Sequence, residues 1–203
     1  MYKSEIFGLF PMPVYSTQLK RKLTKKELLF VENCKKDLYK NEGNLTSNNT
    51  YILNTETFKS LKKQLDLIIK DYFDKIICDN NFKPFITQSW LNYTNQNQYH
   101  HRHKHSNSFI SGVFYINADE NNDKIIFFND KYSFIEPEPK QYNLYNSSSW
   151  WFNVKSCQVL LFPSSLSHCV DVKKGTNTRI SLAFNVFVKG KFGNEKKLTE
   201  LNL

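Results

Sequence analysis

Histidine is concentrated in one short stretch of this chain. Four of the five histidines lie within positions 100–105, in the order His100-His101-Arg102-His103-Lys104-His105, and the fifth is His168. Alternate residues of a β-strand point to the same face, so His103 and His105 can share a face that excludes Lys104. Imidazole nitrogen is a ligand for iron, copper, nickel and zinc. We therefore expect His103, His105 and His168 to bind one metal ion and to leave positions open for other ligands.

The alternative interpretation is that the histidine tract is a surface feature with adventitious metal affinity. On the tract alone, that interpretation would be favoured. The region around His168 changes the balance, because a second group of residues with its own chemistry follows it in the sequence.

That second group lies on an alternating segment that begins at Arg179. Its apolar residues fall on one face, and its polar or small residues fall on the other: Arg179, Ser181, Ala183 and Asn185. If the apolar face packs against helices, Arg179 and Ser181 point inward, and a buried arginine needs an anionic partner. One candidate is a protein acid such as Asp171 or Asp130. The other is a dicarboxylate cosubstrate that Arg179 and Ser181 would anchor while its far end chelates the metal.

The elements that must position these residues divide into an early helical part and a later strand-rich part. Residues 6–19 are expected to be extended, with prolines that suit an edge strand. Thr24 to Glu27 is a capping box that opens a helix expected to end near Gly43. A second helix is expected from about Thr55 to Cys78, with a buried apolar stripe.

From about Phe82 the pattern changes to period-two alternation, which is typical of strands. Eight are expected: 86–93, 99–105, 110–116, 125–128, 150–154, 159–162, 168–172 and 179–188. The fold class is therefore mainly β with flanking helices, a jelly-roll or cupin-like barrel with two N-terminal helices packed outside. The segment 136–149 is either a lid over the site or a hairpin loop.

Composition fits one domain over residues 1–203, and no internal repeat is present. We divide it into an N-terminal strand with supporting helices (1–81), a barrel core (82–190) and a C-terminal tail (191–203). The net charge is +9, but the lysines are scattered, so nucleic-acid binding is weakly supported. Widely spaced cysteines and the lack of a signal or long apolar run predict a cytoplasmic protein without membrane contact. The oligomeric state stays open, with a homodimer among the options.

With these residues in order, the sequence resembles the iron(II)- and 2-oxoglutarate-dependent oxygenases, within them a small bacterial and phage group. The order H-x-H, SG-x-x-Y, FP, H and R-x-S carries the resemblance through these positions: His103, His105, Ser111, Gly112, Tyr115, Phe162, Pro163, His168, Arg179 and Ser181. It covers nearly the whole chain, most densely from Trp90 to Asn185. It implies a double-stranded β-helix, an iron site, and a contact of Arg179 and Ser181 with the far carboxylate of 2-oxoglutarate. Tyr93 or Asn92 would add a second cosubstrate contact.

Two positions depart from the wider pattern. Most of the superfamily has Asp or Glu where this chain has His105, so the third ligand is either His105 or a carboxylate from elsewhere. Cys157 stands in a turn where the group usually has Gly, which should perturb only the loop.

The resemblance implies that the chain uses Fe(II), 2-oxoglutarate and O₂ to hydroxylate a substrate, with release of succinate and CO₂. The substrate, a small molecule or a macromolecule, is not readable from the sequence. Two alternatives stay open. A cupin-type dioxygenase or isomerase would not need Arg179, and a metal-stabilised binding module would show no turnover.

Overall fold

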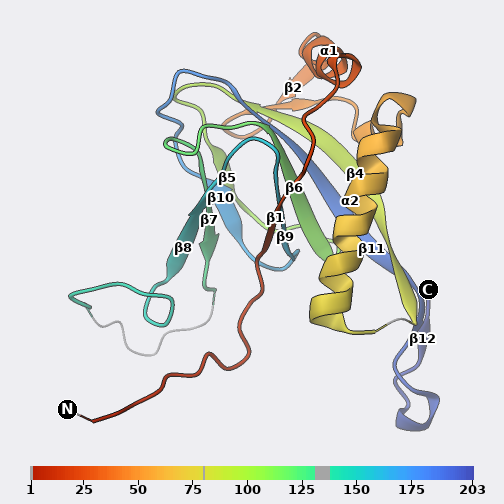
Figure 1. The fold of residues 1–203 in the computed structure, drawn as a ribbon, viewed down its shortest axis with the longest axis vertical. Coiled ribbons are helices and arrows are strands. Elements are labelled where there is room, and N and C mark those ends of the chain that lie inside the picture. The colour runs from red at the N-terminus through yellow and green to blue at the C-terminus, as the bar shows by residue number, and fades with distance from the viewer. Residues whose placement is uncertain (1, 80, 131–137) are drawn as a thin grey trace.

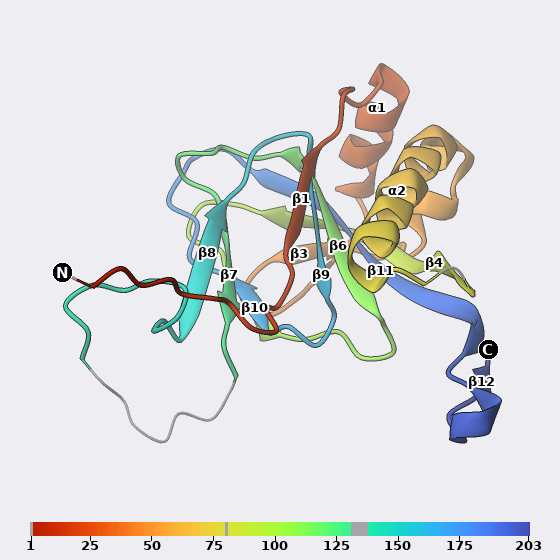
Figure 2. The ribbon, with the colours of Figure 1, turned by 60° about the horizontal axis from the view of Figure 1, so that its bottom comes forward.

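Three layers are stacked in this structure: helices, a large β-sheet and a small β-sheet (Figure 1). The computed structural model describes residues 2–79, 81–130 and 138–203. Figure 2 shows the helices on one side of the large sheet and the small sheet on the other. No helix among these residues is long and apolar enough to cross a membrane.

The helical layer begins with the predicted capping box. Thr24 accepts a hydrogen bond from the backbone of Glu27, and the Glu27 carboxylate accepts one from the backbone of Thr24. Helix α1 (Lys25–Cys34) follows, and α2 (Lys59–Tyr72) comes after two short 3₁₀ turns (Ile52–Asn54 and Glu56–Phe58). A π-helical turn (Phe73–Ile77) extends α2, so the second helix agrees with its predicted range up to Cys78, which caps its end.

The first helix is shorter than predicted, and this corrects the expectation that it reaches Gly43. It ends at Cys34, and the chain then forms a hairpin of β2 (Leu38–Lys40) and β3 (Leu45–Ser47). Gly43 lies in the hairpin turn with φ +90°, a conformation that glycine adopts without a steric penalty. Pairing of β3 with β4 satisfies backbone groups that a longer helix would have satisfied internally.

The large sheet has the strand order β1-β9-β6-β11-β4-β3-β2, and β12 pairs with β11. Its remaining strands are β1 (Tyr15–Gln18), β4 (Phe82–Thr94), β6 (Ile110–Asn117), β9 (Gln158–Pro163), β11 (Arg179–Phe192) and β12 (Leu201–Asn202). A 3₁₀ turn (Glu195–Lys197) connects β11 to β12. Of the segment 6–19 that was expected to be extended, Tyr15–Gln18 forms a strand, β1, and it lies at the edge of the sheet as predicted.

The small sheet has the order β5-β10-β7-β8. Its strands are β5 (His100–His103), β7 (Lys124–Phe128), β8 (Ser149–Asn153) and β10 (His168–Val170). All eight predicted strands are therefore present. The two sheets face one another as in a jelly roll, but they do not close into a continuous barrel.

Two apolar cores cover the two faces of the large sheet. The first lies between that sheet and the helices and includes Leu61, Leu65, Leu182 and Phe184. The second lies between the sheets; it is made of Tyr115, Ile125, Phe127, Val154, Leu160 and Phe162. Because β11 separates them, its apolar side chains face the helices and its alternate residues face the small sheet.

The segment 136–149 belongs to the connection between the paired strands β7 and β8. Residues 136 and 137 lie outside the described part of the chain. In the rest, the side chains of Tyr142, Leu144 and Tyr145 are exposed.

Candidate metal centre

Three histidines from three segments meet between the sheets. His103 ends β5 and His168 begins β10, and the two are directly opposite each other in the antiparallel register. His105 lies two residues beyond β5, where its backbone nitrogen donates to the carbonyl of Ser164. The ring centroid of His103 lies 4.3 Å from that of His168 and 5.1 Å from that of His105. The ligand nitrogens of the three side chains all lie within 4.8 Å of one another.

Each of these imidazoles is oriented by a hydrogen bond from its Nδ1 atom to an oxygen. His103 donates to the backbone carbonyl of His101 at 2.8 Å, and His168 donates to that of Leu166 at 3.0 Å. His105 donates to the side-chain oxygen of Asn185 at 2.5 Å. Because an amide oxygen only accepts, the proton of each neutral ring lies on Nδ1, and Nε2 keeps its lone pair.

The rings are held in this neutral form. Burial is the main factor that lowers the pKa of His103, to about 4, and that of His168, to about 3. Neighbouring histidines lower both values further. Burial also lowers the pKa of His105, against the effect of its bond to Asn185. At neutral pH the three side chains are thus uncharged, as imidazole must be to bind a metal ion.

The Nε2 atoms of His103 and His105 are 3.1 Å apart, so two lone pairs face each other at hydrogen-bonding distance with no proton between them. A cation between them removes this conflict. Two nitrogens about 2.1 Å from one ion and at right angles to each other are about 3.0 Å apart. The donor set therefore fits a borderline transition-metal ion, iron(II) included. Among the described residues, no carboxylate joins the set.

Arg179 lines the same cavity as the three histidines and has no acidic partner in the described part of the chain. Its side chain is buried, and its Nε and Nη1 atoms make no hydrogen bond. Asp130 instead contacts Arg102 and Lys104, and Asp171 lies 3.6 Å from Lys124. The interpretation that one of these two acids pairs with Arg179 is therefore wrong.

A row of polar side chains crosses three strands beside Arg179. Ser181 on β11 is in register with Asn92 on β4 and Tyr115 on β6, and all three line the cavity. Within the described residues, the hydroxyls of Ser181 and Tyr115 make no hydrogen bond. Burial raises the pKa of Tyr115 above its ordinary value, which keeps the phenol protonated as a donor. Two hydroxyls and a guanidinium can therefore bind one carboxylate.

The structure does not bring Tyr93 to this row. Adjacent residues of a strand point to opposite faces, so Asn92 faces the cavity and Tyr93 faces the helices. The Tyr93 hydroxyl donates to the carbonyl of Val31 in the helix-side core. Asn92 in turn accepts a hydrogen bond from Thr46 at 3.0 Å.

Three side chains at the site were not among the predicted site residues. Tyr115, a residue of the SG-x-x-Y pattern, is buried and also lines the cavity. Asn185 lies on the predicted inward face, but its contact with His105 joins two positions that are 80 residues apart in the sequence. His100 lines the cavity as well, with its ring stacked 4.5 Å from that of His103.

Residues 88–185 match the family described as "Putative 2OG-Fe(II) oxygenase". Solved structures with the same fold include a prolyl hydroxylase from Trichoplax adhaerens in complex with a hypoxia-inducible-factor peptide (12% identity, TM-score 0.60, 86% of this chain and 83% of that one). HygX from Streptomyces hygroscopicus, with nickel, 2-oxoglutarate and hygromycin B bound, has 11% identity, TM-score 0.59 and coverages of 86% and 82%. SnoN, an α-ketoglutarate-dependent epimerase from nogalamycin biosynthesis, has 6% identity, TM-score 0.59 and coverages of 88% and 81%. No curated protein sequence matches.

Proposed function

Since the chain belongs, through residues 88–185, to the 2-oxoglutarate- and iron(II)-dependent oxygenases, we propose that it hydroxylates an organic substrate at the histidine centre. The balanced reaction consumes one 2-oxoglutarate, one O₂ and one C–H bond. It yields succinate, CO₂ and a C–OH group. The observation that carries the proposal is the buried guanidinium of Arg179, which has no acidic partner among the described residues and shares a cavity with the imidazoles of His103, His105 and His168.

In this proposal His103, His105 and His168 hold the iron, and Arg179 with Ser181 holds the far carboxylate of the cosubstrate. Bound iron(II) supplies the activation of O₂, which side chains alone do not provide. The residues of this chain position the reactants. The hydrogen bonds at Nδ1 fix the three rings, and Tyr115 and Ser181 donate to the carboxylate that Arg179 neutralises.

The substrate would approach from a depression outside the cavity. This depression also reaches His103 and His105, and its other lining residues include Tyr39, Asn41, Trp90, His101 and Ser106. Because these side chains are hydrogen-bonding groups and aromatic rings, they suit a polar group next to the reacting carbon.

An anaerobic titration with Fe(II) and 2-oxoglutarate tests both halves of the site. We expect the visible charge-transfer band of the chelated cosubstrate in the native protein, followed by succinate formation when O₂ is admitted. His168→Ala should lose the band with iron binding. Arg179→Gln should keep iron binding but need much more cosubstrate.

Arg102→Gln is the matched control, because it removes a nearby positive charge from a side chain that does not line the cavity. It should titrate like the native protein. If Arg179→Gln binds 2-oxoglutarate as tightly as Arg102→Gln does, the guanidinium has no role as an anchor. A metal enzyme that does not use this cosubstrate would then be the better description.

A further inference from the structure

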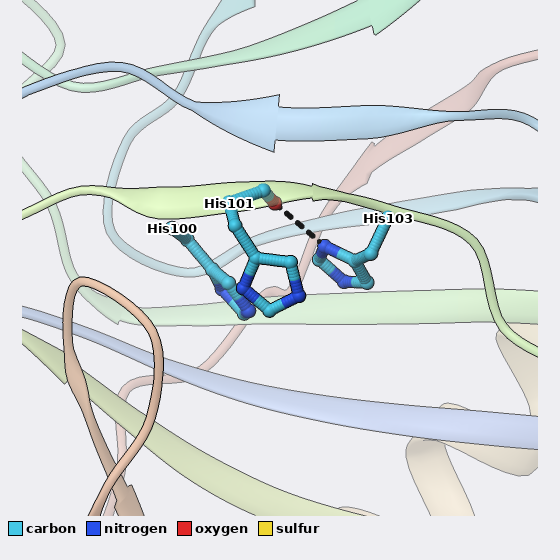
Figure 3. Close-up of side chains that lie close together, drawn as sticks. All are labelled: His100, His101 and His103. Carbon is cyan, nitrogen blue, oxygen red and sulfur yellow. Dashed lines mark hydrogen bonds between the residues drawn. The ribbon is translucent and has the colours of Figure 1, made fainter.

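Strand β5 carries two more imidazoles beside His103. Figure 3 shows the rings of His100, His101 and His103 gathered on one side of the strand. The ring centroid of His101 lies 5.2 Å from that of His100 and 4.9 Å from that of His103. The ligand nitrogens of the three side chains all lie within 4.8 Å of one another, as they do in the set with His105 and His168.

An irregularity in strand pairing produces this grouping. His103 is opposite His168 and His100 is opposite Val170, so β5 takes three residue steps where β10 takes two. In a regular strand, His100 and His101 would point to opposite faces. The extra residue is a β-bulge, and bulges redirect side chains next to active sites. Here it lets two consecutive histidines reach the ring of His103.

His101 has an unused nitrogen. Its Nδ1 atom is buried and makes no hydrogen bond with the described residues, although 30% of the side chain is exposed. The nearest acid oxygen, in Glu42, is 4.0 Å away, which is too long for a hydrogen bond. The Nε2 atom of His100 accepts a hydrogen bond from the side-chain amide of Asn41 at 3.2 Å, and a metal ion at this nitrogen would replace that bond. Both rings border the outer depression, so an ion can reach them from solvent.

We propose that His100, His101 and His103 form a second metal-binding position at the mouth of the centre. Three imidazoles suit a divalent ion such as zinc or cobalt. The position shares His103 with the inner set of His103, His105 and His168. Because Nδ1 of His103 donates to the His101 carbonyl, only Nε2 is available, and an ion at one position excludes an ion at the other. An ion held at the outer position therefore withdraws a ligand from the inner one.

Cobalt(II) alone is a suitable probe, because its absorption spectrum reports the ligand set without turnover. The titration compares the native protein, His168→Ala, His101→Ala and the double variant, with folding checked by circular dichroism. His168→Ala removes a ligand of the inner set only. His101→Ala removes the outer ring but keeps the backbone carbonyl that orients His103.

We expect the native protein and His101→Ala each to bind one cobalt ion per chain at the inner set. His168→Ala should still bind one ion, with a different spectrum from the outer set. The double variant should bind cobalt at least about tenfold more weakly than His168→Ala does. His105→Ala, which breaks the inner set beyond the end of β5, provides the same comparison if His168→Ala does not fold.

Equal cobalt affinity of His168→Ala and the double variant would overturn the second position. Two cobalt ions per native chain would overturn the sharing of His103. Failure of the inner site has a separate signature, because His101→Ala would then bind no cobalt.

Discussion

Arg179 is a buried cation that forms no ion pair with any described residue. Burial lowers its pKa from the usual value, against the opposing effects of Tyr115 and Asp123, but a guanidinium remains charged at neutral pH. The interior therefore holds a charge whose Nε and Nη1 atoms make no hydrogen bond with the described residues. Such a residue costs stability until its ligand arrives. The position therefore indicates a binding function more strongly than a structural one.

Replacement of this cation by an apolar side chain of similar length should make the ligand-free protein more stable. We expect Arg179→Met to raise the free energy of unfolding in urea by about 1–3 kcal/mol and to abolish stabilisation by 2-oxoglutarate. A structural arginine would behave in the opposite way, with a large loss of stability in the variant.

Asn185 is the side chain that orients a candidate ligand ring, whereas His103 and His168 are oriented by backbone carbonyls. Asn185→Leu should therefore weaken metal binding about 10–100-fold. Without the acceptor oxygen, the proton of the neutral His105 ring can lie on either nitrogen, and the ring orientation is no longer fixed. Competition with a chromogenic chelator measures the affinity. Asn185→Asp, which keeps an acceptor oxygen, should bind metal nearly as the native protein does; equal losses in both variants would contradict the orienting role.

At this scale the sequence predicts much of the site, because strand alternation is a strong constraint. Alternation predicts that Arg179 and Ser181 point to the cavity and that His103 and His105 can point to the same face. It does not fix contacts between strands, so Asn185 and Tyr115 were not identified. The choice between Asn92 and Tyr93 was left open, although a shift of one residue reverses the face.

Among the elements, β6 lies so close to β11 that position 112 has no room for a side chain. A Cβ atom on Gly112 would lie 2.1 Å from the ring of Phe184, in the core beneath the site. We expect Gly112→Ala to lower the free energy of unfolding by about 1–3 kcal/mol, measured in urea. Gly8→Ala, which has nothing within 4 Å, is the control and should be neutral. Equal stability of the two variants would show that the strands separate easily.

The start of α1 should make stability depend on pH. Burial would raise the pKa of Glu27, but hydrogen bonds from Arg21 and Thr24 outweigh it and hold the pKa below its usual value. A carboxyl with a lowered pKa stabilises the fold above its unfolded-state pKa, and that contribution disappears as the pH falls through the folded-state value. Glu27→Gln should therefore be less stable than the native protein at pH 7, with the difference shrinking below about pH 4.

Denaturant curves at pH 7 and pH 3, with a chelator present, measure this difference. A gap of the same size at both pH values would mean that Glu27 is not ionised in the way that its contacts indicate.

Element boundaries were predictable where local chemistry sets them. The capping box fixes the start of α1, and alternation locates all eight predicted strands. The end of α1 was placed too late, because Leu38 continues the helical spacing while its backbone pairs in a hairpin. That hairpin is favourable only because it pairs with the neighbouring edge of the large sheet, and the local spacing of apolar residues carries no information about that edge.

At the scale of the whole molecule, the residues proposed to bind the metal and the cosubstrate come from two layers. His103 and His168 belong to the small sheet, whereas Arg179 and Ser181 belong to the large one. With a redox-inert ion such as Ni(II) present, 2-oxoglutarate at about 100 times its Kd should add about 2.7 kcal/mol of stability. For a chain of this size, that raises Tm by about 5–10 °C.

Glutarate is the control for this effect. It has both carboxylates but no keto group, so it can bind Arg179 without chelating the ion, and its effect on Tm should be much smaller. An equal rise with both compounds would contradict a ligand that spans the layers.

The sheets do not close into a barrel, and this has a consequence for the catalytic cycle. Under the proposed reaction, 2-oxoglutarate contacts the metal at one end and Arg179 with Ser181 at the other, so it joins the small sheet to the large one. The reaction removes the C1 carboxylate as CO₂ and converts the keto carbon into a carboxylate, so succinate is one carbon shorter and no longer has the keto-acid pair that chelates the ion. Under this proposal, each turnover removes the contact by which the cosubstrate joins the two sheets, and this eases the release of the product.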